Sequence, residues 1–357
     1  MEHQSFVDWM KALGMLLIVT GHIYGDPYHI FNSVSLPVYT KQLGVAFFVF
    51  ITGWSLANDA RPGRKVVFNR IFPIYFYGIT SALFLSAIFF VNGMDINESN
   101  YLPFFGGINV FFNYFPANPT TWYIGTYLHL VLFWFFFIRG REIRKRHLVA
   151  AFLVENILRS LVIAMDQNTV AYMMLPNWLT IFLLGGYLHK KRDAGWNPKV
   201  LLLVIAWGVV LAFWSSSFNS LPFEKAFPFL ELSFGNYWET PFQSLLISII
   251  YIANTLVIME IVRYLPRLRI VSFFARNTLI IFIMHMPIIH AFSIYIYELL
   301  DVISLRRLIW VFILYVGIAI ASEIIQKFIN MKLLCNKSWG ILQKMMPRLL
   351  SEPTKKI

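Results

Sequence analysis

Long runs of apolar residues dominate this 357-residue chain, and short polar segments separate them. A helix that crosses a bilayer needs about 20 mostly apolar residues. Ten segments reach or nearly reach that length, so the pattern predicts an all-α, polytopic membrane helix bundle. The predicted spans are residues 7–25, 41–58, 67–92, 119–138, 147–165, 170–189, 199–217, 241–264, 276–297 and 306–328. No small-residue cleavage pattern follows the first of them, which indicates a retained span rather than a signal peptide.

Lys and Arg are concentrated in alternate connections between these spans. The loop after the second span holds Arg61, Arg64 and Lys65, and similar clusters follow the fourth, sixth and eighth spans. The segment 327–356 is basic as well, whereas the long connection 93–118 has no Lys or Arg. Because Lys and Arg are enriched in cytoplasmic loops, this alternation predicts that both termini are cytoplasmic.

The composition agrees with a membrane protein and excludes several other classes. Hydrophobic residues make up 58% of the chain and charged residues 13%, against about 45–50% and 25% in soluble domains. These values exclude a soluble enzyme, a disordered chain and a collagen-like fibre. The net charge of +12 is explained by the cytoplasmic loops, so nucleic acid is not expected as a partner. A single cysteine, Cys335, allows no internal disulfide and no cysteine metal cluster, and no metal site is predicted.

The domain organisation follows from the absence of any polar stretch long enough to fold alone. We expect one transmembrane domain over residues 1–330 and a basic cytoplasmic tail over residues 331–357. The sequence does not indicate the oligomeric state.

Ionisable residues inside the first span are the most informative candidates for chemistry, since such groups are costly in a membrane. Lys11 and His22 are eleven residues apart, so they share one helix face and lie roughly 16 Å apart along the axis. Asp8 precedes Lys11 by about one turn and can pair with it. Each residue also has a structural interpretation. The Lys11 side chain would extend to the cytoplasmic headgroups, and His22 would only form a hydrogen bond to a neighbouring helix.

Weaker candidates lie in later spans. Glu155 and Arg159 are four residues apart and are expected to pair, either in a structural ion pair or at a reacting site. His285 lies near the middle of the ninth span and is either a second catalytic histidine or a buried structural one. Four residues near the outer ends of spans four and six are candidates for sugar binding, with interfacial anchoring as the alternative. They are Trp122, Tyr123, Asn177 and Trp178.

Several motifs resemble those of the integral-membrane acyltransferase 3 family. Its signature is Arg or Lys, ten residues and then His, and Lys11 and His22 have this spacing. Lys rather than Arg at position 11 keeps the charge and loses the planar two-pronged donor. Further motifs that resemble the family are Phe47-Phe48-Val49-Phe50-Ile51-Thr52-Gly53, Arg61-Pro62-Gly63-Arg64, Asn69-Arg70-Ile71-Phe72-Pro73-Ile74-Tyr75, Thr121-Trp122-Tyr123-Ile124 and Ile283-Met284-His285-Met286-Pro287.

The resemblance implies an O-acyltransferase of the bacterial inner membrane. Its members transfer an acyl group, usually acetyl, from a cytoplasmic thioester such as acetyl-CoA to a glycan or lipid acceptor at the outer face. On this basis, Lys11 would contact the donor, and His22 would act as a general base or carry the acyl group itself. The donor phosphates would be held by a basic group at the cytoplasmic side, consisting of Arg61, Arg64, Lys65 and Arg70.

Two other functions fit a chain of this kind. One is a transporter or flippase for lipid-linked glycans, and the other is a scaffold that binds glycan without chemistry. Transporters tend to show internal repeats and a charged site at the membrane midplane. The sequence shows no evident repeat, and its best motif extends from the inner interface to the outer half, which favours the acyltransferase.

Overall fold

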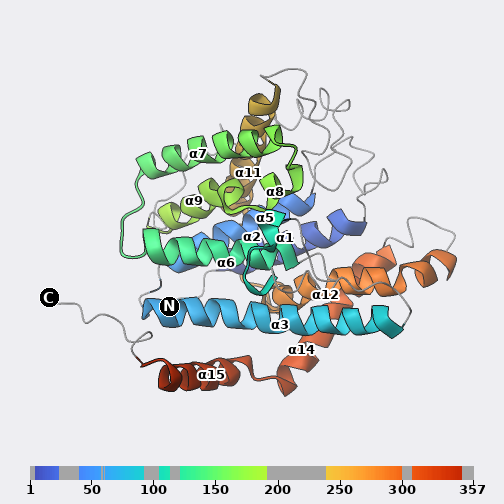
Figure 1. The fold of residues 1–357 in the computed structure, drawn as a ribbon. Helices are drawn as coiled ribbons and strands as arrows, with labels where there is room; N and C mark the ends of the chain where they lie inside the picture. Colours follow the sequence, from blue (N-terminus) through green and yellow to red (C-terminus); the bar gives the residue numbers. More distant parts are fainter. Residues whose placement is uncertain are drawn as a thin grey trace.

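The structure, a computed structural model, describes residues 5–23, 40–57, 59, 61–91, 104–112, 121–190, 239–299 and 308–347. Helices account for almost all of these residues, and there is no strand among them. Figure 1 shows the long helices side by side, with most of them running in a similar direction. The prediction of an all-α helix bundle is therefore confirmed.

Six helical segments of the described chain are long and apolar enough to cross a membrane, which supports a multi-pass membrane protein. A shorter apolar helix covers Lys41–Ala57. The predicted span 199–217 lies outside the described residues, so ten remains the predicted number of spans, and the orientation also stays a prediction. The six segments are Gly63–Ala87, Thr121–Ile138, Lys145–Ala164, Ser244–Val262, Arg269–Ile289 and Leu308–Phe328.

Three helices form the centre of the bundle, with α2 packed between α1 and α9. Glycine makes this close packing possible. A Cβ atom on Gly53 would collide with the carbonyl of Phe182, and one on Gly185 would collide with the carbonyl of Phe50. Small residues let helix backbones approach closely where no hydrophobic effect drives association. The three helices are α1 (Ser5–Ile23), α2 (Thr40–Ala57) and α9 (Leu179–His189).

A second group of helices covers the opposite side of α1. The helix α12 packs against α1, α3 and α14, and α15 lies along α3, as Figure 1 also shows. The ring of Trp339 on α15 contacts Phe68 on α3, with centroids 5.3 Å apart. The segment predicted as a basic tail thus begins with a helix. The elements are α3 (Gly63–Val91), α12 (Arg269–Leu299), the π-helical turn η5 (Phe312–Gly317), α14 (Ile318–Phe328) and α15 (Met331–Met345).

A third group contains α7, which packs against both α9 and α11. Its outward face exposes apolar side chains such as Leu153, Ile157 and Leu161, as expected for a surface that faces lipid. The remaining elements connect this group to the centre. They are α5 (Asn109–Phe112), α6 (Thr121–Phe133), the π-helical turn η3 (Trp134–Ile138), α7 (Lys145–Ala164), α8 (Asn168–Met173), the 3-10 turn η4 (Leu175–Trp178) and α11 (Glu239–Val262).

The predicted continuous helix over 170–189 is broken in the structure. The helix α8 ends at Met173, and α9 begins only after the turn η4, which contains Pro176. Proline has no N–H to continue the helical ladder. The carbonyl of Tyr172, which a residue at position 176 would bond in an unbroken helix, instead accepts a hydrogen bond from the indole Nε1 of Trp178 at 3.1 Å. This break turns Asn177 and Trp178 into the bundle.

Two other helix boundaries differ from the prediction. The helix α3 begins at Gly63, so Arg64 and Lys65 belong to its first turn rather than to a loop. The helix α12 begins at Arg269 and not at residue 276. As a result Arg276 lies on a helix, where its Nη2 atom donates to Oε1 of Glu323 at 2.9 Å.

Candidate functional site

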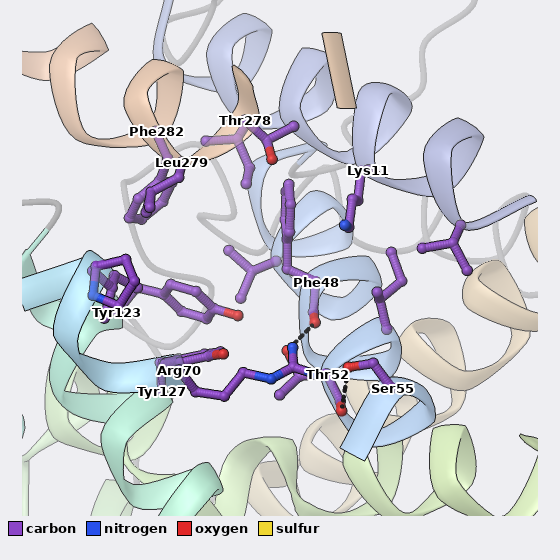
Figure 2. A pocket seen from close by; sticks show the side chains of 16 residues that line it. Lys11, Phe48, Thr52, Ser55, Arg70, Tyr123, Tyr127, Thr278, Leu279 and Phe282 are labelled. Atoms are coloured by element: carbon purple, nitrogen blue, oxygen red, sulfur yellow. Dashed lines mark hydrogen bonds between the residues drawn. The ribbon is translucent and has the colours of Figure 1, made fainter. Parts of the chain in front are cut away.

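A cavity of about 260 Å³ lies between α1, α2, α3, α6 and α12. Lys11 and Arg70 both line it, and Figure 2 shows their nitrogen atoms on opposite sides of the same space. The structure therefore brings together a lysine from the first helix and an arginine from the third. Other lining residues that bear on the chemistry carry a hydroxyl group or, in Phe282, an aromatic ring. They are Thr52, Ser55, Tyr123, Tyr127, Thr278 and Phe282.

The hydroxyl groups on α2 are held in place by the helix that carries them. Thr52 donates to the carbonyl of Phe48 at 2.7 Å, and Ser55 donates to the carbonyl of Thr52 at 3.1 Å. Each hydroxyl oxygen keeps lone pairs that can accept a further hydrogen bond. The cavity thus offers cationic donors and hydroxyl acceptors to a polar molecule.

Acidic groups balance part of the positive charge. The charges of Asp8 and Arg70 both act on the Lys11 ammonium, in agreement with the predicted proximity of Asp8 and Lys11. Asp8 also accepts a hydrogen bond from Ser272 on α12 at 2.7 Å. On the other side, Arg70 lies 3.9 Å from a carboxylate oxygen of Asp59.

The residues predicted to hold the donor phosphates, Arg61, Arg64 and Lys65, gather at the beginning of α3, outside the cavity lining. Arg61 donates from Nε and Nη2 to the two oxygens of Asp59 at 2.8 Å and 2.5 Å. Burial raises the pKa of Asp59, but the hydrogen bonds and charge of Arg61, with that of Arg70, outweigh it and hold the pKa below its ordinary value. The N-terminus of a helix adds a partial positive charge to this group.

The two histidine candidates meet although they lie on α1 and α12, far apart in the sequence. The ring centroids of His22 and His285 are 5.0 Å apart. His285 is fully buried, and its Nδ1 atom lies 2.7 Å from the carbonyl oxygen of Phe282. A pair of imidazoles at this distance can share or exchange protons.

Phe282 stands between the cavity and the histidine pair. Its ring lines the cavity, and its centroid lies 5.9 Å from that of His285. On a second side it meets Tyr123 edge to face, with centroids 5.4 Å apart. Phe282 therefore connects the cavity to His285, and His285 in turn contacts His22.

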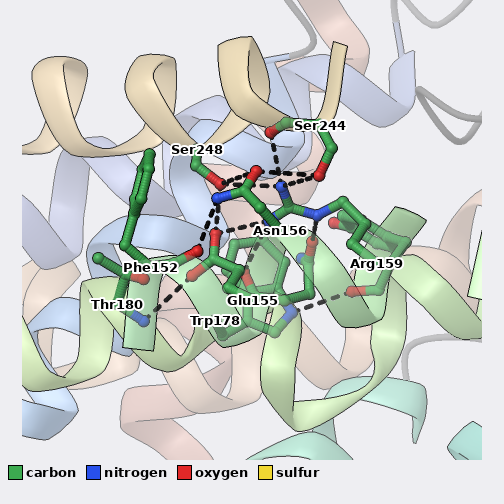
Figure 3. Close-up of polar contacts among 10 residues, drawn as sticks. Phe152, Glu155, Asn156, Arg159, Trp178, Thr180, Ser244 and Ser248 are labelled. Atoms are coloured by element: carbon green, nitrogen blue, oxygen red, sulfur yellow. Dashed lines mark hydrogen bonds and ion pairs between the residues drawn. The ribbon is translucent and has the colours of Figure 1, made fainter. Parts of the chain in front are cut away.

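Glu155 and Arg159 form the predicted pair, and they do so in a fully buried network (Figure 3). Arg159 donates to Oε1 of Glu155 at 2.6 Å, and Ser248 donates to the same oxygen at 2.6 Å. The other oxygen of Glu155 accepts the backbone N–H of Thr180 at 3.1 Å. Both carboxylate oxygens are thus used in contacts among α7, α9 and α11.

The guanidinium of Arg159 is satisfied in the same way. Its Nε donates to Oδ1 of Asn177 at 2.7 Å, and its Nη1 donates to the carbonyl of Ser244 and to the hydroxyl of Ser248 at 2.7 Å and 2.8 Å. A buried ion pair of this kind needs such additional hydrogen bonds. We therefore regard the Glu155 network as a structural connection and do not include Glu155 in the reacting centre.

The four residues considered for sugar binding differ in their surroundings. Tyr123 lines the cavity, and Trp122 packs beside it on Tyr172 with centroids 5.0 Å apart. Asn177 and Trp178 are both fully buried. Trp178 stacks on Tyr251 with ring planes 12° apart, so it contributes to the core between η4 and α11.

Four polar residues of the cavity lining were not named as candidates from the sequence. They share a detectable signal, because each is a polar residue within an apolar span. Tyr127 follows Tyr123 by one helical turn, which places both rings on one face of α6. The others are Thr52, Ser55 and Thr278.

Comparison with known proteins identifies the family. A model described as an acyltransferase domain, that of the acyltransferase 3 family, matches residues 4–325. The chain belongs to the acyltransferase 3 family. No curated protein and no solved structure matches it. The resemblance predicted from the motifs is confirmed, and membership indicates a membrane acyltransferase that uses an acyl donor.

Within this acyltransferase, a metal site would require several acidic, histidine or cysteine side chains to lie together. No group of three or more such residues that could hold a metal ion occurs in the part of the chain that the structure describes. The arrangement described above offers imidazole, hydroxyl and cationic groups for chemistry.

Proposed function

We propose that this protein is an O-acetyltransferase of the bacterial inner membrane. It would transfer acetyl from cytoplasmic acetyl-CoA to a hydroxyl of a surface polysaccharide or of its lipid-linked precursor. The observation that carries the proposal is the cavity with Lys11 and Arg70 at its sides and with Phe282, the neighbour of the histidine pair, in its wall.

The donor is an extended anionic molecule, and the basic residues are distributed to suit it. Arg61, Arg64 and Lys65 gather at the N-terminus of α3, where both charge and helix dipole favour phosphate. Lys11 and Arg70 line the cavity further in. A volume of about 260 Å³ fits the narrow pantetheine arm rather than the nucleotide, so we assign the arm to the cavity and the phosphates to the start of α3.

The length of the pantetheine arm relates Lys11 to His22, the two ends of the motif in α1. Lys11 and His22 lie on a single unbroken helix, and eleven residues rise roughly 16 Å. An arm that passes Lys11 would bring its thioester toward His22. We assign the hydroxyls of Thr52 and Ser55 to the amide groups of the arm, which need partners inside the bundle.

His22 would supply the reacting nitrogen. As a general base it takes the proton of the acceptor hydroxyl while the oxygen attacks the thioester carbonyl, and the sulfur then leaves as the thiol of CoA. In the alternative, His22 attacks the thioester first and forms an acyl-imidazole, which the acceptor hydroxyl then cleaves. Both routes need a His22 nitrogen without a proton. His285 provides a second imidazole next to that of His22.

A transporter or flippase is the competing function, and the observed cavity does not favour it. Its two cationic residues and its hydroxyls can hydrogen-bond the amide and hydroxyl groups of a thin polar arm. Family membership also supports group transfer.

Base-labile acetyl esters on envelope polysaccharide provide the test of the proposed function. They should be detected by mass spectrometry in cells that contain the protein and should be absent from cells that lack its gene. Purified protein should also release CoA from acetyl-CoA when extracted envelope glycan is added. Lost glycan export with unchanged acetylation would instead support the transporter.

A further inference from the structure

His285 is held in one tautomer by the backbone of its own helix. Its Nδ1 atom lies 2.7 Å from the carbonyl oxygen of Phe282 and 3.2 Å from that of Ile281. Carbonyl oxygens only accept, so Nδ1 must carry the proton. A neutral imidazole has a single N–H, and a fully buried imidazolium would be costly. The Nε2 atom of His285 is therefore a bare acceptor.

This acceptor has no partner in the described part of the chain. Nε2 of His285 is buried and makes no hydrogen bond to any residue that the structure describes. Buried polar atoms are normally paired, and an exception in a native structure requires an explanation. At a reacting centre, one explanation is a hydrogen bond that tightens only when substrate is bound.

The nearest ring is that of His22, at 5.0 Å between centroids and with the ring planes tilted by 51°. Two imidazoles joined by an N–H···N bond of about 2.9 Å have centroids roughly 5 Å apart, since each nitrogen lies close to 1 Å from its ring centre. The observed separation equals that of a bonded pair. A rotation of the His22 ring, without movement of either helix, would direct an N–H at Nε2.

We propose that His285 is a positioning residue for His22. In the reacting enzyme, Nε2 of His285 accepts the N–H of one His22 ring nitrogen, which leaves the other His22 nitrogen without a proton. The role rests on the proposed acetyl transfer and holds for both of its routes.

The protons balance in the direct route. The acceptor hydroxyl gives its proton to the bare nitrogen of His22, and the opposite N–H of His22 strengthens its hydrogen bond to Nε2 of His285. The oxygen–acyl bond forms, the acyl–sulfur bond breaks, and the proton passes from His22 to the leaving thiolate. His285 neither touches the acyl group nor keeps the proton at the end of the cycle.

Two substitutions separate this role from a purely structural one. The amide of His285→Asn reaches the position of Nδ1 and keeps the bond to the Phe282 carbonyl, but it places no acceptor where Nε2 was. The longer amide of His285→Gln places its oxygen near the position of Nε2. If the role of His285 is structural, the Asn variant should therefore keep the higher kcat. If His285 positions His22, the Gln variant should keep the higher kcat.

The experiment measures CoA release from acetyl-CoA by purified protein, with extracted envelope glycan as acceptor. We expect kcat to fall about 100-fold or more in His285→Asn, with the KM for acetyl-CoA unchanged within about twofold, and to recover at least about tenfold in His285→Gln. His285→Phe, which keeps a ring of similar size without an acceptor, should match the Asn variant. Gel filtration and melting temperature identify which variants are folded.

The possible failures are distinguishable. Full kcat in any folded variant without an acceptor, or a Gln variant as slow as the Asn variant at equal melting temperature, would overturn the positioning role alone. Absence of CoA release by the unaltered protein would overturn the proposed function, and the positioning role with it.

Discussion

The imidazole rings of His22 on α1 and His285 on α12 lie with their centroids 5.0 Å apart, beside a cavity that Lys11 and Arg70 share. The helices α1 and α12 thus both contribute to one site. Phe282 links them, because its ring faces the cavity and its carbonyl accepts the N–H of His285. This arrangement leads to predictions for donor binding, stability and catalysis.

Lys11 is expected to act in donor binding. A hydrogen bond to a charged group contributes about 1.5–3 kcal/mol, so Lys11→Met should raise the KM for acetyl-CoA about 10- to 100-fold. Arg70→Gln should act in the same direction because it lines the same cavity. Initial rates over a range of acetyl-CoA concentrations measure the effect.

Two lysine variants serve as controls for that measurement. Lys11→Arg keeps the charge and should retain most of the affinity. Lys332→Met removes an exposed charge from α15 and should leave the KM unchanged. Equal KM values for Lys11→Met and the unaltered protein would remove Lys11 from the donor site.

Asp59 should stabilise the protein in a pH-dependent way. Its pKa is lowered in the fold, so its ion pair with Arg61 contributes fully above the unfolded value and is lost as pH falls through the lower folded value. Arg61 is 51% exposed, and a pair of this kind contributes little, so Asp59→Asn should lower the melting temperature by roughly 1–3 °C near pH 6. The difference should shrink as the pH falls below 3.8, the ordinary value. A difference that stays constant from pH 6 to pH 3 would rule out the assignment.

Arg159 should matter for stability rather than for turnover. Removing one partner of a buried ion pair costs about 3–5 kcal/mol, so Arg159→Met should lower the melting temperature strongly. The double variant Glu155→Leu with Arg159→Met leaves no unpaired buried charge and should be more stable than Arg159→Met alone. The kcat of the folded fraction should be unchanged in both, as measured after gel filtration, and a lost kcat at full stability would return Glu155 to the reacting centre.

Gly53 should tolerate no larger residue. A Cβ atom there meets the Phe182 carbonyl of α9, and backbone cannot move aside cheaply, so Gly53→Ala should destabilise by about 1–3 kcal/mol. Gly340 on α15 has no atom near its would-be Cβ. Gly340→Ala is the matched control and should raise stability by up to about 1 kcal/mol, because alanine favours helix. Thermal unfolding in detergent compares the two, and similar values would contradict the close packing of α2 and α9.

Some side-chain pairs could be predicted from the sequence because both members of each pair lie on one helix. The spacing of Lys11 and His22 fixes their shared face, and Glu155 and Arg159 pair because they are one turn apart. The length of the apolar runs also identified the helices, since runs of this length have few alternatives in a membrane protein.

Other parts required tertiary structure. The approach of His285 to His22 depends on how α1 packs against α12, and no local pattern specifies that contact. The burial of Asn177 follows from the break at Pro176, which an apolar run over 170–189 conceals. Thr52 and Tyr127 are ordinary residues in their helices and gain a role only because both line the cavity.

The measurement that tests the central claim most directly is CoA release from acetyl-CoA by the His22→Ala variant, with extracted envelope glycan as acceptor. General acid–base catalysis contributes about 10²–10⁴-fold, so the account predicts that kcat falls by at least about 100-fold while the KM for acetyl-CoA and the melting temperature stay close to those of the unaltered protein. A folded His22→Ala variant that releases CoA at the unaltered rate would contradict the account.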